Sequence, residues 1–219
     1  MPKFIRENSL TLVMTILFLV AVAGQTLAGW SVYDDDQEEH GREAVSLQAY
    51  LTSAHFGEAL FENWESEFLQ MGLFVLFTVW LRQKGSPESK KIDGEEEVDR
   101  TPDPHRTGAP WPVRAGGIAA KVYANSLSIA LLGLFVVSFA LHVYTGAARY
   151  SEEELAHGGD EVSAIAYLVT PQLWFESFQN WQSEFMSIGA LVVLSIFLRQ
   201  RGSSESKPVD APMRETGGG

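Results

Sequence analysis

Two glutamates at matching places in the chain, Glu67 and Glu184, have the setting in which a carboxylate often does chemistry. Each lies in the motif Asn-Trp-x-Ser-Glu-Phe and precedes an apolar run that ends at an arginine, Arg82 or Arg199. If that arginine marks a membrane surface, about 15 residues of helix place the glutamate about 22 Å deeper, within the hydrocarbon. An ionisable residue at that depth is costly and usually functional, so we predict that both glutamates bind a proton or a cation.

Polar residues around each glutamate fall on one face of the predicted helix, because positions separated by three, four and seven residues share a stripe. Their side chains offer oxygen and nitrogen atoms that would support a bound ion. An imidazole in the preceding apolar run could also bond Glu184 or titrate. The candidate site comprises Asn63, Ser66, Glu67 and Gln70 from the first copy of the motif, Asn180, Ser183 and Glu184 from the second, and His142.

The same residues have a plainer interpretation as helix-packing groups. Asn, Ser and Glu side chains hold transmembrane helices together through interhelical hydrogen bonds. In that interpretation Trp64 and Trp181 are interfacial anchors, and the glutamates lie just above the hydrocarbon. Arg82 and Arg199 are interfacial anchors in both interpretations. A transport site needs water at the glutamates, whereas packing groups need to be dry and fully hydrogen-bonded.

The chain contains the same segment twice, since residues 8–93 align with residues 125–210 without a gap. A repeat of this length is a duplicated domain rather than a solenoid unit of about 20–50 residues. Each copy has two apolar runs. The first run of each copy approaches the roughly 20 residues that cross a bilayer, whereas the second has only about 14. The four runs are Leu10–Leu27, Phe68–Leu81, Leu127–Tyr144 and Phe185–Leu198.

The distribution of charge predicts how these runs cross a membrane. Basic residues flank the outer ends of each pair of runs, and acidic stretches at residues 34–39 and 152–154 form the expected loops within each pair. The positive-inside rule then places both termini and the central linker in the cytoplasm. We predict an all-α membrane protein whose four transmembrane helices form a bundle of two tandem, parallel, pseudo-symmetric hairpins.

Four segments follow from this organisation: a first two-helix repeat over residues 1–85, a disordered cytoplasmic linker over 86–117, a second repeat over 118–202, and a disordered tail over 203–219. The second helix of each repeat is expected at residues 54–84 and 171–201, with a short helix or interfacial stretch before it. The first apolar run resembles a signal peptide, but its internal counterpart favours a retained helix.

Composition excludes several classes of function. The chain has no cysteine and a net charge of −12, so we expect no thiolate chemistry and no nucleic-acid partner. Phosphate-binding, zinc-protease and serine-hydrolase motifs do not occur, so we predict neither an enzyme nor a cofactor. His40 and His157 are interpreted as solvated loop residues rather than metal ligands, with a weak divalent-cation site as the alternative.

The duplicated Asn-Trp-x-Ser-Glu-Phe motif and the Leu-Arg-Gln-[Lys/Arg]-Gly-Ser sequence that follows it resemble an uncharacterised family of small bacterial membrane proteins with a domain of unknown function. This resemblance implies the bacterial inner membrane and no particular mechanism. From the residues, we expect a small proton or cation channel or carrier, in contact with lipid and assembled as a homo-oligomer if one chain encloses too small a pore. The alternative is a non-transporting scaffold or envelope-stress accessory protein.

Overall fold

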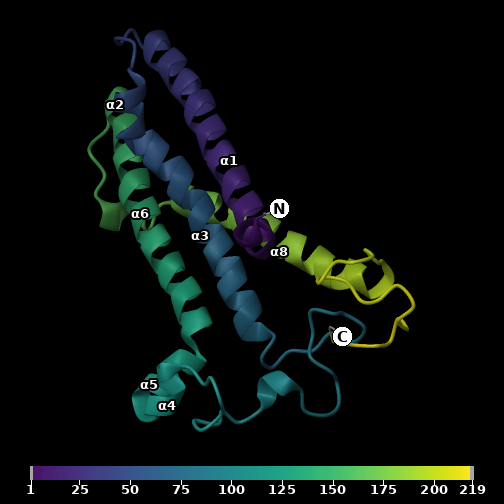
Figure 1. Cartoon of the computed structure of the whole chain (residues 1–219). Coiled ribbons are helices and arrows are strands. Elements are labelled where there is room, and N and C mark those ends of the chain that lie inside the picture. The colour runs from purple at the N-terminus through teal and green to yellow at the C-terminus, as the bar shows by residue number, and fades with distance from the viewer. Residues whose placement is uncertain (1, 218–219) are drawn as a thin grey trace. The chain divides into compact units, whose positions relative to one another are not determined.

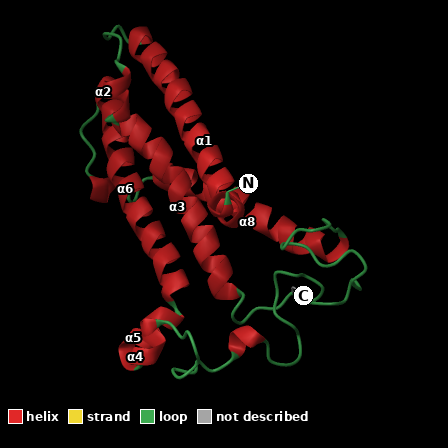
Figure 2. Ribbon diagram, in the orientation of Figure 1, coloured by secondary structure: helices red, strands yellow, loops and turns green. Residues whose placement is uncertain are grey.

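The computed structural model describes residues 2–217, and these residues are helical or loop with no strand (Figure 2). The all-α prediction is therefore confirmed for the described part of the chain. In chain order the helices are α1 (Lys3–Glu39), α2 (Leu47–Leu51), α3 (Ala54–Phe77), a 3-10 turn (Glu97–Asp99), α4 (Trp111–Ala115), α5 (Gly117–Ala124), α6 (Ser126–Ala156), α7 (Ala164–Tyr167) and α8 (Pro171–Phe197). Figure 1 labels all of them except the 3-10 turn and α7.

Two of these helices, α1 and α6, are long and apolar enough to cross a membrane. Both carry many exposed large apolar side chains, which lipid would cover. The sequence predicted four such helices, whereas α3 and α8 do not qualify by hydropathy among the described residues. The physical reason is their composition, since the N-terminal half of each helix is rich in Glu, Gln and Asn.

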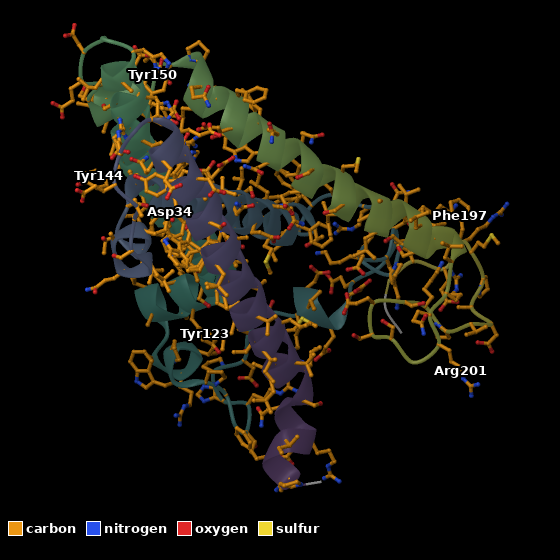
Figure 3. All side chains as sticks on the ribbon, turned by 90° about the horizontal axis from the view of Figure 1, so that it is seen from above. Asp34, Tyr123, Tyr144, Tyr150, Phe197 and Arg201 are labelled. Carbon is orange, nitrogen blue, oxygen red and sulfur yellow. The ribbon has the colours of Figure 1, made fainter. Side chains whose placement is uncertain are left out.

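The second helix of each repeat begins where the sequence predicts and ends earlier. Helix α3 begins at Ala54, where the Ser53 hydroxyl accepts the backbone N–H of Phe56 at 3.2 Å, and α8 begins at Pro171. Their ends at Phe77 and Phe197 replace the expected Lys84 and Arg201 (Figure 3 labels Phe197, and Arg201 in the loop beyond).

Near each of these helix ends an arginine side chain bonds carbonyls that lie in the last turn of α8 and just past the end of α3. Nη1 of Arg82 donates to the carbonyls of Thr78, Val79 and Leu81, and Nη1 of Arg199 donates to their counterparts in the second copy. A guanidinium at a helix C-terminus satisfies carbonyls that have no partner within the helix. The chain then turns instead of continuing as helix.

The turn after each of these helices has the same hydrogen bonds in both copies. The Ser89 hydroxyl accepts the N–H of Gln83 at 2.8 Å, and the Ser206 hydroxyl accepts the N–H of Gln200 at 2.9 Å. The repeated Arg-Gln-[Lys/Arg]-Gly-Ser sequence therefore encodes a local structure. The disorder expected for the linker and the tail as a whole stays a prediction.

Contacts divide the chain into two compact units, which we describe separately. The first unit comprises Met1–Phe61 and Leu141–Thr170, and the second comprises Glu62–Ala140 and Pro171–Gly219.

The first unit shows the duplication as repeated packing. A Cβ placed on Gly29 would collide with the hydroxyl of Tyr50, and one placed on Gly146 would lie 2.7 Å from Cε1 of Tyr167. Tyr33 and Tyr50 have ring centroids 5.7 Å apart, and so do Tyr150 and Tyr167, which are the equivalent pair. In each copy, glycine lets the short helix lie directly on the long one.

The acidic stretches expected as loops are instead the last turns of long helices. Residues 34–39 belong to α1, and residues 152–154 belong to α6. Both helices continue past their apolar runs because an exposed acidic segment can remain helical where solvent surrounds it. His40 and His157 consequently lie at helix C-termini rather than within loops (Figure 3 labels Asp34 and Tyr150 on these two helices).

Candidate functional site

In the second unit, two glutamates of α3 are hydrogen-bonded to polar side chains of α8. The Ser177 hydroxyl donates to Oε1 of Glu65 at 3.0 Å, and Nδ2 of Asn180 donates to Oε1 of Glu62 at 2.5 Å. Glu65 is fully buried and Glu62 is half-buried. The facing residues on α8 are one helical turn apart, so α3 and α8 are joined by a short polar seam.

The two glutamates singled out from the sequence lie in a more accessible setting. Glu67 is exposed and Glu184 is half-buried. Their carboxylates are near enough to interact electrostatically. The structure therefore brings Glu67 and Glu184 into one neighbourhood of the second unit and leaves both of them less enclosed by protein than Glu65.

The supporting polar residues divide into two groups. The hydroxyls of Ser66 and Ser183 each donate at 2.8 Å to the carbonyl three residues earlier, that of Asn63 and of Asn180. These two hydroxyls are thus engaged within their own helices. Gln70 is buried, whereas Asn63 is exposed.

The tryptophans expected as interfacial anchors are half-buried in the structure. Trp181 packs against other aromatic rings of the second unit, with centroids 5.5 Å from Phe178 and 6.4 Å from both Trp174 and Phe135. This packing gives Trp181 a role in holding α8 against α6, since edge-on aromatic pairs add to the burial of apolar area.

His142 lies in the first unit, fully buried, with Glu58 as a neighbour on α3. A ring nitrogen of His142 and a carboxylate oxygen of Glu58 lie within 4.8 Å of each other. Nη1 of Arg149 donates to Glu58, and Nη2 of the same guanidinium lies 3.2 Å from Glu153. Arg149 therefore links an exposed carboxylate to a buried one.

Sequence reasoning missed three glutamates that the structure buries wholly or in part. Glu58, Glu62 and Glu65 are spaced by four and three residues, so they share one face of α3. Glu67 lies about 180° around the helix from Glu58, at 100° per residue. Their spacing of four and three residues, which matches one face of a helix, was the sequence signal that could have identified them.

The comparisons with known proteins identify a family. No curated protein and no solved structure matches the chain. The sequence pattern of the family described as "Domain of unknown function (DUF6766)" matches residues 1–218, and the chain therefore belongs to that family.

Proposed function

We propose that this chain is an integral membrane protein of the bacterial inner membrane with four spans, formed by α1, α3, α6 and α8. Helix α3 has 24 residues and α8 has 27, which corresponds to about 36 and 40 Å, more than the roughly 30 Å of hydrocarbon. Exposed apolar residues on α8, among them Phe175, Met186 and Phe197, suit contact with lipid. The polar residues of α3 and α8 are tolerated because they bond to each other.

In this arrangement the two helical hairpins are parallel, and both termini and the linker are cytoplasmic. The absence of cysteine makes the topology directly testable. A cysteine placed at Glu43 should react with a membrane-impermeant maleimide in intact cells, whereas one at Ser204 should react only after the membrane is permeabilised. Labelling of both positions from the same side would refute the proposed topology.

We propose that the protein carries protons or small cations across the membrane through Glu67 and Glu184. One observation supports this proposal above the others: the two carboxylates share a neighbourhood without being sealed by protein. Repulsion between two such carboxylates is relieved when a proton or a cation binds between them. A site that exchanges ions also needs access, which their partial exposure gives.

The second candidate function is a scaffold that transports nothing, and the polar seam of α3 and α8 favours it. Glu62 and Glu65 accept hydrogen bonds from the facing helix, as packing groups do. We assign these two glutamates to packing and the more accessible pair to ion binding, so the two functions predict different effects of mutation.

Ion flux in liposomes tests this assignment. Purified protein is reconstituted, and proton and monovalent-cation leak is compared for wild type, Glu67→Gln plus Glu184→Gln, and the matched control Glu65→Gln. We expect flux in wild type, its loss in the double variant with folding intact, and retained flux with lower thermal stability in Glu65→Gln. Wild-type flux no greater than that of empty liposomes would refute the transport proposal and leave the scaffold.

Four helices enclose little volume, so we also propose that the working form is a homo-oligomer in the bilayer. Native mass spectrometry of the protein released from detergent would give its stoichiometry. A monomer that still conducts would show that one chain is sufficient.

A further inference from the structure

The turn that follows α8 encloses a cavity of about 770 Å³ in the second unit. Arg201 lies in its wall, together with Gly202 and Ser203 from the same stretch of chain (Figure 3 labels Arg201). Arg201 is exposed, and within the described residues its side chain forms no hydrogen bond and no ion pair. The chain has 28 acidic and 16 basic residues, so a guanidinium that none of those acids engages is a candidate for binding an anion from outside the chain.

The equivalent turn of the first copy is closed by groups of the chain itself. The N–H of Gly85 donates to the hydroxyl oxygen of Thr216 at 2.8 Å, and a Cβ placed on Gly85 would lie 2.6 Å from the carbonyl oxygen of Met213. Nζ of Lys90 donates to Oδ1 of Asp99 at 2.5 Å. The tail and the linker thus supply this turn with a hydroxyl oxygen and a carboxylate.

The turn of the second copy keeps the same donors uncovered. Gly202, the equivalent of Gly85, has a φ of 85°, close to the 89° of Gly85, yet a Cβ placed on it would meet no described atom within 4 Å. Among the described residues, the N–H of Gly202 has no acceptor. The Ser203 hydroxyl accepts the N–H of Glu205 at 3.1 Å and has its own hydrogen left to donate. The carboxylate of Glu205 accepts the Ser204 hydroxyl at 2.9 Å and is not part of the cavity wall.

Two further cations give this turn a positive field. Lys207 is the equivalent of Lys90, and it is buried with its ammonium bonded to carbonyl oxygens instead of a carboxylate. Burial lowers the pKa of Lys207, the charge of Arg199 lowers it further, and Glu215 acts in the opposite direction. Within residues 2–217 no carboxylate forms an ion pair with either cation. The carbonyls that Lys207 contacts, at 3.0–3.3 Å, belong to Pro212, Met213 and Glu215.

We propose that the turn after α8 binds a phosphate group through the guanidinium of Arg201, the hydroxyl of Ser203 and the N–H of Gly202. A guanidinium presents two parallel N–H donors, a geometry that phosphate oxygens match. The cavity is of the size that holds small ligands, so it has room for a lipid headgroup as well as for a free ion.

The phosphate has two possible sources. In the topology proposed above, α8 ends at the cytoplasmic surface, where anionic lipids carry phosphate. Inorganic phosphate offers the same chemistry without a membrane. The binding site itself is independent of the proposed ion transport and draws on the proposed topology only for the source of the ligand.

The test uses full-length protein in detergent, with bound lipid counted by native mass spectrometry. Short-chain phosphatidylglycerol is titrated, and phosphatidylcholine of the same chain length corrects for non-specific attachment. Wild type is compared with Arg201→Gln plus Ser203→Ala and with the matched control Lys84→Gln, which removes the equivalent charge from the covered turn of the first copy. We expect the tightest phosphatidylglycerol to bind equally to wild type and Lys84→Gln. The double variant should bind it at least about tenfold more weakly, the usual effect of losing a charge-assisted hydrogen bond.

Inorganic phosphate, added to the same proteins in a calorimetric titration, separates the two sources. Binding of either probe that depends on Arg201 supports the site and identifies its ligand. Equal affinity of wild type and the double variant for both probes would overturn the proposal. So would the absence of binding by wild type, or an equal loss of affinity in Lys84→Gln.

Two further variants keep the result interpretable. Arg201→Lys retains the charge and loses the two parallel donors, so its affinity should lie between those of wild type and the double variant. The altered side chains lie outside the helices, so thermal unfolding should be the same for all of these proteins. The Glu67→Gln plus Glu184→Gln protein should bind the lipid normally, which distinguishes a failure of phosphate binding from a failure of ion transport.

Discussion

The close approach of glycine to tyrosine in the first unit makes a sharp prediction about stability. Tyr50 and Tyr167 are at most 1% exposed, so neither ring has space to move away from a new methyl group. We therefore expect Gly29→Ala and Gly146→Ala to destabilise the protein, because each added Cβ would meet a tyrosine ring or hydroxyl at less than van der Waals distance.

The size of the effect follows from two opposing terms. Overpacking a filled site costs about 1–3 kcal/mol. Replacing glycine by alanine within a helix returns about 0.8–1 kcal/mol. The net change for Gly29→Ala is therefore about 0–2 kcal/mol of lost stability. A Cβ added to Gly24, which is also in α1, would have no neighbouring atom within 4 Å, so Gly24→Ala should show only the gain.

Thermal unfolding in detergent, followed by circular dichroism, would measure the difference between these variants. At about 2–4 °C per kcal/mol for a chain of this size, Gly24→Ala should unfold a few degrees above wild type. Gly29→Ala should unfold at or below the wild-type temperature, and Gly146→Ala should behave likewise. If both buried-site variants gained as much stability as Gly24→Ala, the repeated glycine–tyrosine packing would be refuted.

Two further predictions concern charged groups outside the apolar runs. Arg149→Met removes the guanidinium that pairs with Glu58, whose side chain is 3% exposed, and should cost about 3 kcal/mol in an SDS unfolding titration, with partial recovery in Arg149→Met plus Glu58→Gln. Burial, followed by the neighbouring carboxylate of Glu205, raises the pKa of Glu88 from 4.5. Stability from this group is present below pH 4.5 and is lost as pH rises through the higher folded-state pKa. Glu88→Gln should therefore be more stable than wild type at neutral pH by less than about 1 kcal/mol, and no different near pH 4; a constant difference at both pH values would contradict this.

Much of the helical framework follows from local signals in the sequence. Ser53 caps α3 and Pro171 begins α8, as serine and proline at helix starts predict. The ends were less predictable: α3 stops at Phe77, and the Arg82 side chain folds back to bond carbonyls just past that end, such as the carbonyl of Val79. No rule of residue spacing predicts that the chain turns at this point instead of forming another turn of helix.

The repeats alone single out Glu67 and Glu184, which are equivalent residues whose carboxylates interact electrostatically. Their role as an ion site stays a prediction. His40 and His157 also occupy equivalent positions, and both line one cavity of the first unit at the ends of α1 and α6. A periodic pattern assigns residues to faces of helices and carries no information about which helix ends meet.

The departures from symmetry are as informative as the repeats. Three acids share one face of α3, whereas uncharged residues take the same positions in α8. A duplicated protein that relied on a symmetric site alone would have no reason to hold three carboxylates on one copy. The acids are Glu58, Glu62 and Glu65, and their equivalents are Phe175, Gln179 and Gln182.

Each of these acids costs desolvation, which a hydrogen-bonded partner must offset. The structure supplies such partners from the second copy, namely Arg149, Asn180 and Ser177. The second copy has therefore become the donor side of an asymmetric set of polar contacts, while the equivalent pair, Glu67 and Glu184, is less enclosed than Glu65.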